Sequence, residues 1–227
     1  ERKQADEDAF LAWINDDAKR RKHFMPHIDE LNAAAVVAGG AQLNDLQRSL
    51  LERGQLLQAA RTLYRWAKER EKPDADRSTG FRDRDRQLVA DRLRRIQSRF
   101  VASVDRTLLE AGATEYRKLP PAEKSTAFEE RLKTIGFDRL YSSTKLESLD
   151  ERLAWLDRPA SAFEQSGDPF IQLAVAIYPD DAAREQRARA RVSRVEGHRN
   201  HYLAALAAYR ASAGRPIYPD ADRTLRV

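Results

Sequence analysis

Apolar residues recur at steps of three and four along most of the chain, which is the spacing of a helix face that packs on a core. Ala, Leu, Arg and Glu fill the segments between boundaries, and these residues lose little side-chain freedom in a helix. The first such stripe lies within residues 3–22 and consists of Ala9, Phe10, Trp13 and Ile14. The pattern predicts an amphipathic helix there, with an apolar face that needs a partner.

Proline and glycine mark the expected ends of the next helices. Because proline is tolerated in a helix's first turn, a second helix is predicted from Pro26 to the pair Gly39-Gly40, which is expected to stop it. A third helix is predicted over residues 44–71 and is expected to end at the loop 72–76. Its apolar stripe consists of Leu46, Leu50, Leu57, Leu63 and Trp66.

The segment from Arg82 onward has the most regular stripe, formed by Leu93, Ile96, Phe100 and Val104. A break is expected near Ser103, because Asp105 can restart a helix that runs to Leu119. Further helices are predicted at residues 122–135, 144–157 and 169–178.

The last helix, residues 180–213, is predicted to be the longest. At 1.5 Å per residue, about 30 residues span about 45 Å, so it is expected to form a spine or an arm. The sequence therefore predicts an all-α fold, an irregular multi-helix bundle with one long C-terminal helix and a short extended C-terminal tail. We expect one helical domain over residues 1–214 and a tail over residues 215–227, since no linker is long enough to separate two domains.

Composition limits the class of protein. The chain has 227 residues, of which 41% are apolar and 34% charged, enough for one sizeable core or two small ones. Its longest apolar run, residues 33–38, is far shorter than a membrane-spanning helix, so no membrane contact is expected. The absence of cysteine excludes disulfides, cysteine-ligated zinc and a thiol nucleophile.

The candidate chemical groups are few. His23 and His27 have the spacing of two ligands on one helix face, but Pro26 between them is expected to break that helix. His198 and His201 are interpreted as ordinary surface or packing residues. No serine lies in a glycine-rich turn, so we predict no catalytic residue, no metal site and no cofactor in this chain.

Charge supports a second reading, a stand-alone helical module that binds nucleic acid or a protein partner. A basic stripe is formed by Arg184, Arg187, Arg191 and Arg194 and could contact phosphates. However, the net charge is only +5, and runs such as residues 82–86 alternate in sign, as solvated helix faces do. The aromatic residues lie on apolar stripes rather than among the arginines, so nucleic-acid binding is disfavoured.

The last ten residues carry a resemblance to a known family. They are Tyr218-Pro219-Asp220-Ala221-Asp222-Arg223-Thr224-Leu225-Arg226-Val227, and their end favours a β-strand without a partner strand. Because the chain also opens on Glu1 without an initiator Met, we expect it to be a piece of a longer protein. The tail resembles the segment leading into the second β-barrel of bacterial chymotrypsin-like serine dipeptidyl peptidases, the dipeptidyl-peptidase seven and eleven group. Weaker similarity is found at residues 119–124, 136–138 and 167–170.

The resemblance implies a helical cap domain inserted between two halves of a double β-barrel. In that family the catalytic His and Asp precede the insertion and the catalytic Ser follows it, so this chain would be inactive alone. The implied partners are the two barrel halves and short peptide substrates, the implied compartment is the periplasm, and a homodimeric parent is left open. Substrate-binding residues stay unassigned, because Asn15, Asn32 and Asn44 do not fit the family's amine-recognition motif.

Overall fold

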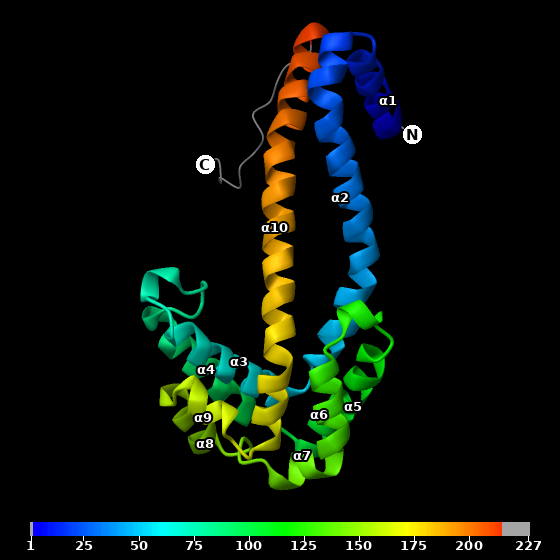
Figure 1. Cartoon of the computed structure of the whole chain (residues 1–227). Helices are drawn as coiled ribbons and strands as arrows, with labels where there is room; N and C mark the ends of the chain where they lie inside the picture. The colour runs from blue at the N-terminus through cyan, green and yellow to red at the C-terminus, as the bar shows by residue number, and fades with distance from the viewer. Residues whose placement is uncertain (1, 215–227) are drawn as a thin grey trace. The chain divides into compact units, whose positions relative to one another are not determined.

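The computed structural model describes residues 2–214 of the chain (Figure 1). Within that range every regular element is a helix, which confirms the predicted all-α class and the long last helix. The predicted extended tail lies outside the described residues. The α-helices are α1 (Arg2–Asn15), α2 (Ala18–Leu51), α3 (Gln55–Arg70), α4 (Arg86–Gln97), α5 (Ala102–Tyr116), α6 (Thr126–Ile135), α7 (Phe137–Ser143), α8 (Leu149–Ala154), α9 (Ala160–Glu164) and α10 (Pro169–Ser212). Short 3-10 turns are η1 (Asp74–Asp76), η2 (Asp83–Asp85), η3 (Pro121–Glu123) and η4 (Trp155–Asp157).

The chain forms two compact units. The hairpin unit consists of the described residues of Glu1–Gly40 and Gln186–Val227, and the bundle unit consists of Ala41–Glu185. The boundaries fall inside α2 and α10, not in loops. This explains why the sequence, which has no linker, gave no sign of a division.

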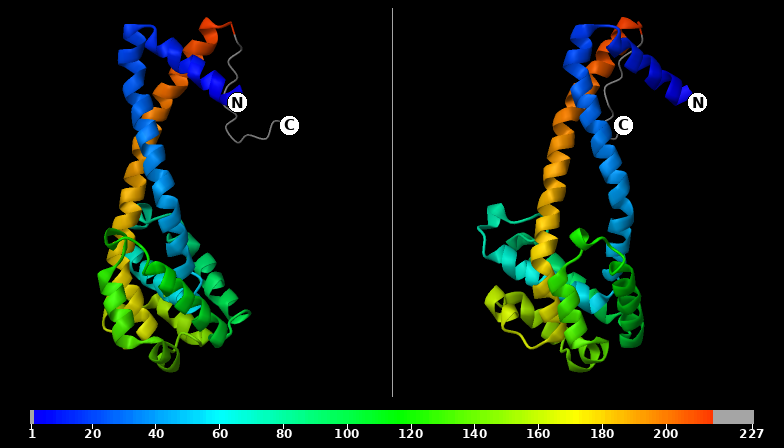
Figure 2. Two further views of the ribbon diagram at one scale, coloured as in Figure 1. Left: turned by 90° about the vertical axis from the view of Figure 1, so that its right-hand side faces the viewer. Right: turned by 45° about the vertical axis from the view of Figure 1, so that its right-hand side comes forward.

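The hairpin unit packs α1 and the first part of α2 against the last part of α10, as both views of Figure 2 show. Its small core contains Phe10, Ile14, Ile28 and Ala205, all buried. The ring of Phe10 contacts the edge of Tyr202 with centroids 5.7 Å apart, and Trp13 packs on Tyr209. The stripe predicted for the first helix is therefore correct at Phe10 and Ile14.

The bundle unit surrounds α3 with the shorter helices and the start of α10 (Figure 1). Trp66 of α3 is buried, and its indole N–H donates to the Leu156 carbonyl over 3.1 Å. Leu57 and Leu63, which the sequence placed on the same stripe, are fully buried. Trp155 is buried as well and packs on Phe163 with ring centroids 4.5 Å apart.

Several predicted helix boundaries are wrong. The helix predicted over residues 3–22 is interrupted at Asp16 and Asp17, and the Asp17 carboxylate accepts hydrogen bonds from two backbone N–H groups at the start of α2. Pro26 and the pair Gly39-Gly40 lie inside α2, which continues to Leu51. Relative to alanine, an interior proline costs about 3 kcal/mol and each glycine about 1 kcal/mol, and α2 continues through all three because helix propagation is cooperative. Likewise α10 runs through Pro179 without a break.

Other breaks were not predicted. The helix predicted over residues 44–71 divides before Gly54, where an added Cβ would lie 3.0 Å from the Leu109 Cδ1 atom. The predicted helix over 144–157 is a turn at residues 145–148 followed by α8 and η4, and the predicted helix over 122–135 starts only at Thr126. The break expected near Ser103 occurs a few residues earlier, between α4 and α5.

Three residues of the predicted apolar stripes, Ala9, Leu46 and Val104, are exposed. Leu46 is 58% exposed and Val104 is 54% exposed. Leu46 lies in α2 and Val104 in α5, each across a helix break from the buried residues of its predicted stripe, so neither stripe continues through the break. Neighbouring helices still approach closely at Gly112 of α5, where a Cβ would lie 2.4 Å from the Leu50 carbonyl oxygen.

Candidate functional site

All four histidines of the chain meet in the hairpin unit. His23 and His27 lie on α2, and His198 and His201 lie on α10. The His27 ring stacks on the His201 ring with centroids 3.7 Å apart and an interplanar angle of 5°. The His23 ring is edge-on to His201 at 5.9 Å. We call this group the histidine cluster.

One contact in the histidine cluster is polar. The Nδ1 atoms of His27 and His198 lie 2.9 Å apart, so one of them must carry hydrogen and the other a lone pair. Burial, followed by the charges of His201, His198 and His23, lowers the pKa of His27. Among the described residues no three His, Cys, Asp or Glu side chains are arranged to hold a metal ion.

The sequence reading of these histidines was therefore wrong in one respect. It placed a helix break at Pro26 and treated the two pairs separately. In the structure α2 is continuous, so His23 and His27 share a face, and the antiparallel α10 brings the second pair onto it.

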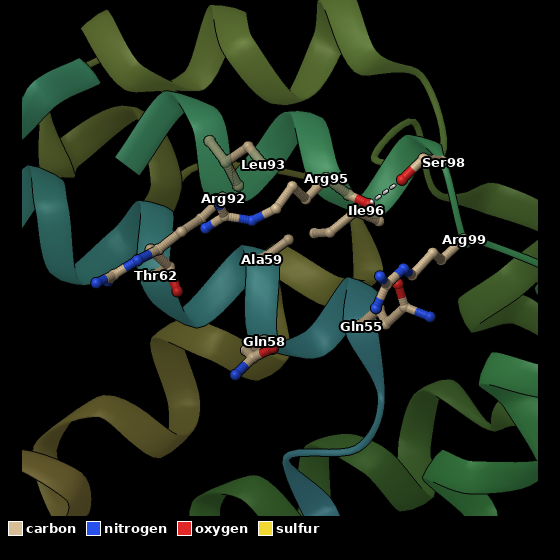
Figure 3. Close-up of a pocket in the computed structure, with 10 residues that line it drawn as sticks. All are labelled: Gln55, Gln58, Ala59, Thr62, Arg92, Leu93, Arg95, Ile96, Ser98 and Arg99. Atoms are coloured by element: carbon tan, nitrogen blue, oxygen red, sulfur yellow. Dashed lines mark hydrogen bonds between the residues drawn. The ribbon is translucent and has the colours of Figure 1, made fainter. Parts of the chain in front are cut away.

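A second site is a pocket of about 500 Å³ in the bundle unit, between α3 and α4 (Figure 3). Its floor is apolar, with Ala59 and Leu93 buried and Ile96 half-buried. Polar side chains form the rest of the lining: Gln55, Gln58, Thr62, Arg92, Arg95, Ser98 and Arg99. We call it the arginine pocket. It contains no carboxylate in its lining.

The N-terminus of α3, which supplies one wall of the arginine pocket, is fixed from behind by a buried acid. The Asp105 carboxylate accepts from the backbone N–H of Gln55 at 2.5 Å and from the Tyr141 hydroxyl at 2.9 Å. Asp105 is fully buried, and burial raises its pKa. Burial raises the pKa of the Tyr141 hydroxyl, and the negative charge of Asp105 raises it further. This contact joins α3, α5 and α7.

The basic stripe of α10 is partly neutralised. Arg184 lies 3.5 Å from Asp181, and Arg194 contacts Glu30 at 2.5 Å. Asp181 also accepts from Arg61, and Glu185 from Arg65. These ion pairs fit the solvated, charge-laced helix face that the sequence favoured over a nucleic-acid surface.

Comparison with known proteins identifies the family of this chain. The family model for peptidase S46 matches residues 1–227. The chain belongs to the peptidase S46 family. It is similar to the Asp/Glu-specific dipeptidyl-peptidase of Shewanella putrefaciens (strain CN-32 / ATCC BAA-453), with 36% identity over 238 residues that cover 99% of this chain. The chain spans 31% of that relative's length.

These similarities support a peptidase-related role and confirm the coarse part of the sequence prediction, a dipeptidyl peptidase family. They do not favour the alternative of an unrelated binding module. Among the described residues, no helix is long and apolar enough to cross a membrane.

Proposed function

We propose that this chain is the helical region of a serine-type dipeptidyl peptidase of the chymotrypsin-like group that includes dipeptidyl peptidases seven and eleven. The observation that carries the proposal is the family match over the whole chain together with a relative that is a dipeptidyl-peptidase. The all-helical architecture of residues 2–214 agrees with the inserted domain that the resemblance implies.

In this proposal residues 1–214 form a cap over the active-site cleft, and residues 215–227 lead into the second β-barrel. A cap excludes water around the developing oxyanion and positions the substrate, advantages that exist only when it closes over the cleft. It also limits entry to short chain ends, as an enzyme that removes dipeptides from N-termini requires.

The catalytic serine, histidine and aspartate are assigned to the barrels, outside these 227 residues. His27 and His198 do not serve as a triad base in this proposal, because each Nδ1 faces the other imidazole. The chain alone should therefore be inactive. The two barrel halves are its proposed partners and the periplasm its proposed compartment.

The cap role can be tested by amide hydrogen exchange. The longer polypeptide that contains this chain is labelled with and without a slowly hydrolysed peptide whose N-terminus is free. Slower exchange in part of residues 2–214 on peptide binding is the expected result, because a closed cap loses local opening. Protection confined to the rest of the polypeptide would contradict the cap role while leaving the peptidase assignment intact. The same peptide with an acetylated N-terminus serves as the control.

A further inference from the structure

The arginine pocket has an excess of positive charge that the described protein does not neutralise. Arg92, Arg95 and Arg99 line it, and none of the three has a carboxylate partner among residues 2–214. Neighbouring arginines behave differently. Arg94 lies 2.8 Å from Asp91, and Arg86 lies 2.8 Å from Asp157. Arginines that are left unpaired around a hollow form a natural site for an anion.

The three arginines occupy one side of the pocket, at steps of three and four along the chain. This spacing places them along one face of α4 and of the residues that follow it. Figure 3 shows Arg92 beside Thr62 at one end and Arg99 beside Gln55 at the other. With a rise of 1.5 Å per residue, Arg92 and Arg99 are separated by about 10 Å along the helix direction. As drawn in Figure 3, the two side chains lie at opposite ends of the pocket, an arrangement that suits an extended ligand better than one small anion.

The lining between the arginines is suited to a peptide. Side chains of Gln55 and Gln58 each offer both a donor and an acceptor, as a peptide backbone does. The apolar floor of Ala59, Leu93 and Ile96 is suited to methylene groups. A phosphate or sulfate ion has only acceptor oxygens and gains nothing from that floor.

We propose that the arginine pocket binds an extended peptide segment carrying two or more carboxylates, which pair with Arg92, Arg95 and Arg99. In an extended chain, side chains two residues apart lie about 7 Å from each other on the same face, so two acidic residues reach neighbouring arginines. The site is formed by α3, α4 and the two residues that follow α4, all within the bundle unit. It therefore stands whether or not the helical region covers a cleft.

The test is a binding titration of the 227-residue chain with tetra-glutamate whose two termini are blocked, at low ionic strength. Binding is monitored by NMR or calorimetry. Tetra-glutamine is the matched peptide without charge. Saturable binding of tetra-glutamate that weakens with added salt is expected, and tetra-glutamine should bind far more weakly. Equal binding of the two peptides, or none, would overturn the proposal.

Variants locate the site. Arg95→Gln should weaken binding about threefold, and the triple change of Arg92, Arg95 and Arg99 to Gln about thirtyfold, as expected for exposed ion pairs. Arg94→Gln is the control, since Arg94 lies on the same helix but outside the pocket and pairs with Asp91. Because all four side chains are exposed, the variants should fold, which far-UV circular dichroism verifies. Equal loss in the control variant would contradict the assignment.

A further titration distinguishes a site for an acidic peptide from a site for a simple oxyanion. Inorganic phosphate is titrated at the same ionic strength. If phosphate binds as tightly as tetra-glutamate and the triple variant abolishes both, the pocket is a simple oxyanion site and the peptide proposal fails. If the peptide binds at least about tenfold more tightly, the proposal holds.

Discussion

The Nδ1 atoms of His27 and His198 lie 2.9 Å apart across α2 and α10. At that separation only one of the two nitrogens can carry hydrogen. Double protonation would place two N–H groups head to head, beside the stacked ring of His201 and near His23. About one turn along the same helix pair, Arg194 forms an ion pair with Glu30. Protonation of both histidines at acid pH is therefore expected to destabilise the hairpin unit.

The stability of the hairpin unit should fall as the pH falls through about 6.5. His27 in the unfolded chain titrates near its ordinary pKa of 6.5, whereas burial and the other three imidazoles lower its pKa in the folded unit. As the pH falls below about 6.5, the unfolded state binds more protons than the folded state, so the free energy of unfolding decreases. Hydrogen exchange of residues 18–40 and 186–212 between about pH 7.5 and 5.5, above the titration of ordinary carboxylates, measures the effect.

The double variant His27→Asn with His198→Asn supplies the control for this pH dependence. Asparagine retains a hydrogen-bonding group near the position of Nδ1 and does not titrate in this range. The acid-induced loss of protection should shrink in the double variant. An unchanged pH profile would show that these histidines do not set the acid response.

Asp105→Ala should destabilise the bundle unit by about 2–4 kcal/mol, since it removes the cap of α3 and leaves a buried hydroxyl without a partner. Tyr141→Phe is the matched change on the other side of the bond and should cost about 1 kcal/mol, because Asp105 keeps its backbone donors. Denaturant unfolding of the chain compares the two. Equal costs would mean that the capping bond contributes nothing.

Two glycine substitutions should act in opposite directions. Gly112→Ala places a Cβ 2.4 Å from the Leu50 carbonyl oxygen and should cost about 1–3 kcal/mol, because backbone must move. Gly39→Ala meets nothing within 4 Å inside α2 and should stabilise that helix by about 0.5–1 kcal/mol. Thermal melting of both variants tests the pair. Destabilisation by Gly39→Ala would contradict the continuous helix.

Trp66→Ala should cost about 3–5 kcal/mol, because it empties a buried site and removes the bond to the Leu156 carbonyl. The half-buried Trp13 is the comparison, and its replacement by alanine should cost less. Denaturant unfolding, followed by far-UV circular dichroism because both changes remove a tryptophan, provides the measurement. A larger loss for Trp13→Ala would reverse the assignment of the main core.

The sequence predicted the helices but not their limits. Leu57, Leu63 and Trp66 recur at helical spacing along α3, and this local spacing suffices to predict that they lie in the core. Pro26 and Gly39 are local stop signals, yet α2 continues through both, because a residue's local preference does not by itself decide where a long helix ends.

The candidate sites depended on pairings that no local pattern encodes. His27 and His198 are 171 residues apart in sequence, and their contact requires α2 and α10 to run side by side. The arginine spacing at 92, 95 and 99 was visible in the sequence. What could not be predicted was which neighbouring arginines would find an acidic partner and which would face a pocket.

The most direct test of the proposed dipeptidyl peptidase activity is release of a fluorescent group from dipeptidyl substrates, including ones with Asp or Glu as the second residue, by the longer polypeptide that contains this chain. We predict release that requires a free substrate N-terminus, is abolished by a serine-directed inhibitor, and is absent from the 227-residue chain alone. A longer polypeptide that is silent on every substrate, or activity in the isolated chain, would contradict it.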